Sequence, residues 1–110
     1  MAEVVVKDYS KEIEEMFIRF LVSSPDLFVR CLSILDYMLF HDGNCSRVVE
    51  FLSEYVKEYN VMPSLDIIYA NTKQTISILP AVDQVKHEAW FLSEFENFSR
   101  HRALERAILS

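Results

Sequence analysis

The sequence has very little glycine and proline, and this scarcity bounds the fold class. One glycine, Gly43, and three prolines in 110 residues leave little material for the tight turns of β-hairpins. No stretch shows sustained alternation of apolar and polar residues, which a half-buried strand would require. Because 51% of the residues are hydrophobic, the chain can still bury a core. We therefore expect one all-α domain.

Basic residues, long apolar runs and paired cysteines are also scarce. Eleven basic against seventeen acidic residues give a net charge of −6, which argues against general binding to nucleic-acid phosphates. No run approaches the roughly eighteen apolar residues of a membrane span, and residues 1–10 do not resemble a signal peptide. Cys31 and Cys45 lack CxxC spacing and are predicted to be reduced thiols. We expect a cytoplasmic protein with no membrane association.

Apolar residues at helical spacing predict three longer helices in the first sixty residues. The first spans 11–24, and the second begins at Ser24 as N-cap with Pro25 in the first turn and continues to about residue 35. The third spans about 46–59, after the turn HDGN, and ends at Asn60. The predicted core phenylalanines are Phe17, Phe20, Phe28, Phe51 and Phe95.

The second half of the chain is less regular until its final segment. Ser64 is a candidate cap for a short helix that ends near the polar residues 71–75. Pro80 excludes one continuous helix through residues 71–84, and the structure of that range cannot be assigned from the pattern. Residues 87–110 then show the longest helical pattern of the chain.

The apolar face of this final helix changes near Arg100. At about 100° per residue, Phe91, Phe95 and Phe98 share one narrow sector. A second apolar group lies largely on the opposite side and comprises Ala103, Leu104, Ala107 and Ile108. We expect the first half of the helix to pack on its own domain and the second half to meet a different helix. No Gly or Asn stop signal follows, so the pattern predicts that the helix continues.

Two polar groups could suggest chemistry but have simpler interpretations. His41, Asp42 and Cys45 are too few for a structural zinc site, which needs about four ligands, so a polar turn is the better interpretation. Glu12, Glu14 and Glu15 are interpreted as a solvated helix face and not as catalytic carboxylates.

Two further clusters concern binding. The basic residues Arg100, His101, Arg102 and Arg106 are diluted by Glu105 and are predicted to form interhelical or subunit-facing ion pairs. Tyr55, Tyr59 and Tyr69 are better explained by packing at the core and its rim than by base stacking.

Two segments carry a resemblance to a known family. YVKEYNVMPSLDIIY, residues 55–69, has an aromatic helix end, an apolar residue, Pro and Ser before a short helix, and WFLSEFENFSRHRALERAIL forms the final helix. In this order they resemble the N-terminal domain of DnaB-type replicative DNA helicases, and most of all those of tailed bacteriophages. The likeness covers nearly the whole chain, which corresponds to the first quarter or so of such a helicase.

The resemblance implies a helical-bundle head at 1–99, held by residues 90–98, and the start of a hairpin helix at 100–110. Hairpins of neighbouring helicase subunits would pair into a collar, and primase or a helicase loader would be further partners, in the bacterial cytoplasm. The implied interface residues are Arg102, Ala103, Leu104, Arg106, Ala107 and Ile108.

The motor domain of that family is absent from this chain. One glycine excludes the GxxxxGK[ST] loop, so ATP and Mg²⁺ would belong to the missing part, and we expect no catalytic, cofactor or metal residues here. The alternative is a freestanding helical adaptor or regulator that binds another protein. A GxxxxGK[ST] motif in the reading frame beyond Ser110 would select the helicase.

Overall fold

The computed structural model describes residues 9–109, and all the regular secondary structure within that range is helical. The helices are α1 (Lys11–Ser23), α2 (Pro25–Cys31), the 3-10 helix η1 (Tyr37–Leu39), α3 (Gly43–Tyr59), α4 (Leu65–Thr72) and α5 (Ala81–Leu109). The expected all-α class is confirmed.

Side-chain caps set most of the helix starts. The Ser24 hydroxyl accepts a hydrogen bond from the Leu27 N–H, and Pro25 occupies the first turn of α2, as predicted. Ser64 caps α4 in the same way, also as predicted. Asn60 ends α3 in the left-handed conformation with φ of 56°, which confirms its predicted role as a helix stop.

Some boundaries differ from the predicted ones. α2 ends at Cys31 and does not continue to residue 35. The backbone N–H groups of Leu32, Ile34 and Leu35 each donate to the carbonyl three residues earlier, so this segment forms turns and not an α-helix. α3 begins at Gly43, three residues earlier than expected, because Asp42 caps it by accepting from the Cys45 N–H. In the range 71–84, which the sequence pattern left unassigned, α4 ends before Lys73, which has φ of 61°. α5 begins directly after Pro80.

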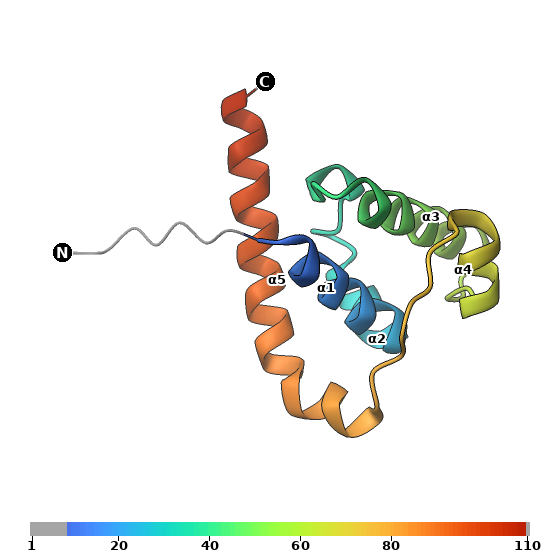
Figure 1. Cartoon of the computed structure of the whole chain (residues 1–110). Helices are drawn as coiled ribbons and strands as arrows, with labels where there is room; N and C mark the ends of the chain where they lie inside the picture. The colour runs from blue at the N-terminus through green and yellow to red at the C-terminus, as the bar shows by residue number, and fades with distance from the viewer. Residues whose placement is uncertain (1–8, 110) are drawn as a thin grey trace.

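Aromatic rings join α1 to α5 at the centre of the core. The ring of Phe17 lies 5.9, 5.3 and 5.1 Å from those of Phe91, Phe95 and Phe98, and all four side chains are buried. Of the predicted core phenylalanines only Phe51 is partly exposed. Figure 1 shows α5 standing along one side of the other helices, with its C-terminal turns extending past α1. The core therefore holds the middle of α5 and leaves its last turns beside the bundle.

Candidate interaction surface on the long helix

The buried stripe of α5 ends in a charged residue. Phe91, Phe95 and Phe98 are completely or almost completely buried, and the next position on the same face is Arg102, four residues further along. The Arg102 side chain is only 3% exposed. The apolar stripe changes face near Arg100 because the core position after Phe98 is occupied by a guanidinium group.

Arg102 is surrounded by hydrogen-bond acceptors from distant parts of the chain. One guanidinium nitrogen donates to Glu14 Oε2 at 2.7 Å and to the Leu39 carbonyl at 2.8 Å. The other donates to the Tyr9 carbonyl at 2.8 Å, and the guanidinium carbon lies 4.8 Å from the centre of the Phe98 ring. The side chain is therefore used inside the fold of its own chain.

Glu14 completes this buried cluster from α1. Its carboxylate, 1% exposed, also accepts hydrogen bonds from the backbone N–H groups of His41 at 2.9 Å and Asp42 at 3.0 Å. These contacts fix the loop that leads into α3, so one carboxylate joins α1, α5 and the start of α3.

Two sequence-based assignments are corrected by this cluster. Glu14 is buried, whereas Glu12 and Glu15 are exposed as the predicted solvated face requires. Arg102 lies in the core, so it does not belong with the surface residues among which the sequence placed it. The signal that could have identified both is the regular spacing of Arg102 after Phe98, because a charge on a buried stripe needs an opposite charge elsewhere in the core.

The other five residues assigned to the interface lie at the surface of α5. Leu104 is 61% and Ile108 73% exposed, and Ala103, Arg106 and Ala107 are also exposed. The structure thus shows Leu104 and Ile108 on the outside of the head domain, as the change of face predicted.

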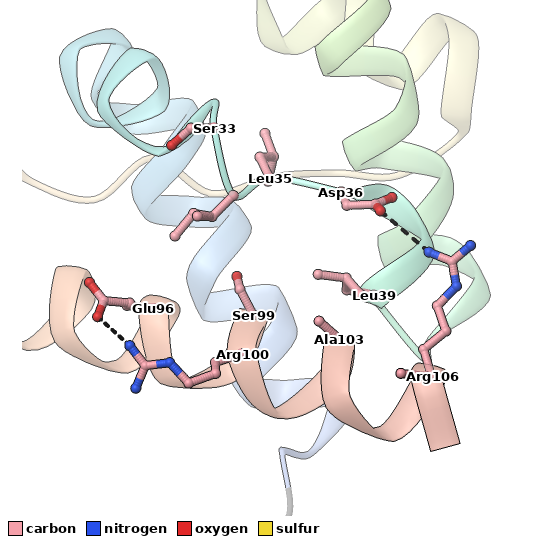
Figure 2. Close-up of a pocket in the computed structure, with 11 residues that line it drawn as sticks. Ser33, Leu35, Asp36, Leu39, Glu96, Ser99, Arg100, Ala103 and Arg106 are labelled. Atoms are coloured by element: carbon pink, nitrogen blue, oxygen red, sulfur yellow. Dashed lines mark hydrogen bonds and ion pairs between the residues drawn. The ribbon is translucent and has the colours of Figure 1, made fainter. Parts of the chain in front are cut away.

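An open groove lies beside this surface. It runs between α5 and residues 33–39, has a volume of about 930 Å³, and is lined on α5 by Ser99, Ala103 and Ala107. Figure 2 shows Leu35 and Leu39 facing Ser99 and Ala103 across it. Residues 33–36 were not recognised from the sequence as part of any surface.

Two ion pairs stand at the groove, one toward each end. Glu96 pairs with Arg100 at 2.7 Å along α5, and Asp36 pairs with Arg106 at 3.4 Å across the groove (Figure 2). All four side chains are more than two fifths exposed. The charges of the groove therefore balance, although the chain carries a net charge of −6. Arg106 thus forms an ion pair, but its partner Asp36 precedes η1 and is not in a helix. The interhelical ion pair expected for the basic cluster is instead the one between Arg102 of α5 and Glu14 of α1.

Three further polar side chains, Cys31, Cys45 and Asp42, have shifted pKa values. Burial is the main reason that the pKa values of the Cys31 and Cys45 thiols are raised, which favours the protonated form of both. The N–H of Cys45 lowers the pKa of the Asp42 carboxyl, which fits its role as the cap of α3. Across the described residues, no three His, Cys, Asp or Glu side chains are grouped so that they could hold a metal ion.

Comparison with known proteins found no matching family model, curated protein or solved structure. Among the helices within residues 9–109, none combines the length and apolar content that crossing a bilayer requires.

Proposed function

We propose that this chain is a protein-docking domain that uses the last turns of α5 as its docking element. The observation that carries the proposal is the exposure of Leu104 and Ile108, 61% and 73%, on a helix whose opposite face is fixed in the core. Two large apolar side chains one helical turn apart form the usual contact stripe of a helix that binds another helix.

The buried Glu14–Arg102 pair supports this role because it fixes α5 next to the exposed residues. Arg102 lies two residues before Leu104, and its three hydrogen bonds to other elements hold this part of the helix in place. A helix that is already ordered loses less conformational entropy when it binds, so more of the contact energy becomes affinity.

Our specific proposal is the N-terminal assembly and partner-docking domain of a hexameric DnaB-type replicative helicase. Its support is the resemblance of residues 55–69 and 90–109, together with an all-α head from which the end of α5 extends. The domain would contribute to the subunit collar and recruit primase or a helicase loader. It would have no catalytic role, since the ATP and Mg²⁺ sites belong to the motor domain of such proteins.

The test is binding of the isolated 110-residue chain to the full-length helicase of which it would be the N-terminal domain, and to the primase encoded by the same genome, measured by size-exclusion chromatography with light scattering. We expect a stoichiometric complex with at least one of them, lost in the double variant Leu104→Glu/Ile108→Glu. The matched control is Val82→Glu/Val85→Glu, because these residues are 71% and 76% exposed at the other end of the same helix.

The outcomes test the docking residues and distinguish the helicase domain from the freestanding adaptor. Equal binding by the test and control variants would show that Leu104 and Ile108 are not the docking residues. A chain that binds neither protein would contradict the helicase assignment and favour the freestanding adaptor.

A further inference from the structure

Aromatic rings line a pocket at the C-terminal end of α3. Phe51, Tyr55 and Tyr59 follow one another at four-residue intervals, so their side chains lie on one face of the helix. The ring centres of Phe51 and Tyr55 are 5.7 Å apart, and those of Tyr55 and Tyr59 are 4.6 Å apart. Tyr59 is 57% exposed, so packing within the chain covers less than half of it. The three rings therefore offer an accessible aromatic surface.

The pocket also carries negative charge. It has a volume of about 380 Å³ and is lined by Phe51, Glu54, Tyr55, Glu58, Tyr59 and Asn71. These residues include two carboxylates and no basic group, in contrast to the groove beside α5, whose charges balance. Among residues 9–109, no ion pair includes Glu54 or Glu58. The chain itself therefore places no cation on either carboxylate.

The position of the two carboxylates on α3 also favours a bound cation. Glu54 and Glu58 are four residues apart on the helix, so their like charges repel each other. Glu58 lies in the last turn, where the helix dipole is negative and favours positive charge. Lys57 is the basic residue of that turn, but it is exposed and does not line the pocket. A cation in the pocket would offset both unfavourable interactions.

Asn71 adds a hydrogen-bond acceptor from α4. Its amide nitrogen donates to the Ile67 carbonyl at 2.9 Å, which leaves the amide oxygen to accept from a ligand. The pocket thus combines aromatic faces, two carboxylates and an amide oxygen. Each of these groups interacts favourably with a positively charged hydrogen-bond donor.

The chain binds one of its own arginines with the same combination of groups. The guanidinium carbon of Arg102 lies 4.8 Å from the centre of the Phe98 ring, and its nitrogens donate to the Glu14 carboxylate and to carbonyl oxygens. A guanidinium group is planar and weakly hydrated, so it stacks on a ring while its edge donates to carboxylates. An ammonium group is a compact and strongly hydrated charge, which suits an open aromatic pocket less well. We propose that the pocket at the end of α3 binds an arginine side chain on an exposed segment of a partner protein.

This site is separate from the docking element on α5. Its residues belong to α3 and α4, and Figure 1 shows α4 and the end of α3 on the side of the bundle away from α5. The inference goes beyond the proposed function and does not rest on the helicase assignment. We expect Leu104→Glu/Ile108→Glu to leave arginine binding unchanged, so the two proposals can fail independently.

The experiment is an NMR titration of the isotope-labelled 110-residue chain with the capped peptide acetyl-Gly-Arg-Gly-amide. We expect chemical-shift changes to concentrate in residues 51–59 and around Asn71. The matched control peptide carries citrulline, which has nearly the shape of arginine but no charge, and it should bind about tenfold more weakly or less. A lysine peptide should bind at least about twofold more weakly than the arginine peptide. Equal binding of the lysine peptide would overturn the assignment of arginine.

Variants of the chain test the two kinds of lining group. Glu54→Gln/Glu58→Gln should weaken binding of the arginine peptide by about tenfold, because it removes both charged acceptors. The matched control is Glu12→Gln/Glu15→Gln, which removes the same charge from exposed positions on α1 and should change binding by less than about twofold. Tyr59→Leu should weaken binding by about two- to fivefold, because it removes an aromatic face. Circular dichroism melts should be alike for all three variants, since the substituted side chains are exposed.

Three results would contradict the site. Equal weakening by the two glutamine variants would show a general attraction to an acidic surface. Shift changes spread over the whole chain would show the same. A titration without shift changes in residues 51–59 would show that the pocket does not bind arginine.

Discussion

Arg102 occupies the position where the buried stripe of α5 would otherwise carry another apolar side chain. A buried ion pair is not automatically stabilising, because both charges lose their hydration and regain it only through good partners. Here the partners are present: Arg102 has acceptors on Glu14, Leu39 and Tyr9, and Glu14 has donors on Arg102, His41 and Asp42. Removing either side chain therefore leaves the other as an unpaired buried charge.

We expect Arg102→Met to lower the free energy of unfolding by about 3–5 kcal/mol, because it leaves the Glu14 carboxylate without its cation. Urea denaturation followed by circular dichroism measures this. The matched control is Arg100→Met, whose side chain is 69% exposed and which should change stability by no more than about 0.5 kcal/mol. Adding Glu14→Leu to Arg102→Met should recover part of the loss. Similar midpoints for the two arginine variants would show that the buried pair contributes nothing.

The two thiols provide a second residue-scale prediction. Burial raises the pKa of Cys31 and of Cys45 above the ordinary thiol value of 9.0, so the folded protein keeps both protonated. We expect both to react with a disulfide reagent far more slowly in buffer than in urea. As the pH rises above about 9, the unfolded chain loses its thiol protons first, so stability should fall. Rapid reaction of either thiol in the native protein would contradict its burial.

At the scale of single helices, local signals in the sequence predicted most of the starts and stops. Ser24 with Pro25, Ser64 and Asn60 are local signals, and each caps a helix as expected. The early end of α2 at Cys31 was missed, because apolar residues at helical spacing continue to Leu35 although the chain turns there.

The candidate site was predictable only in part. Leu104 and Ile108 were assigned to the surface because their side of α5 is opposite to Phe91, Phe95 and Phe98. The groove depends on how residues 33–39 pack against α5, and helical periodicity contains no information about such a long-range contact. The Glu14–Arg102 pair was missed for the same reason, since its members are 88 residues apart.

The two faces of α5 should respond differently to substitution. We expect Phe95→Ala to cost about 3–5 kcal/mol, because it removes a buried ring from the core. Leu104→Glu/Ile108→Glu should leave the thermal midpoint of the 110-residue chain nearly unchanged, because both side chains point to solvent. Differential scanning calorimetry of both variants checks the expectation. Unfolding caused by the double glutamate variant would make Leu104 and Ile108 core residues.

At the scale of the whole molecule, charge and the absence of a phosphate-binding loop limit what the chain does by itself. We expect no ATPase activity with or without single-stranded DNA, because one glycine cannot provide a GxxxxGK[ST] loop. Binding to single-stranded DNA should be weak at physiological salt, given the net charge of −6. Phosphate-release and fluorescence-anisotropy assays test these points. Tight binding with a steep salt dependence would show a basic groove that the charge argument overlooks.

The contacts of Arg102 also determine when the protein can become stable during synthesis. Tyr9 and Glu14 leave the ribosome well before Arg102, which follows 93 residues after Tyr9. Until then the Glu14 carboxylate must remain hydrated, and the aromatic residues of α1 lack the phenylalanines of α5. We therefore expect nascent chains stalled before α5 emerges to be digested readily by protease. Resistance should appear only when the ribosome has released Arg102, so the domain becomes stable only after this part of α5 has emerged.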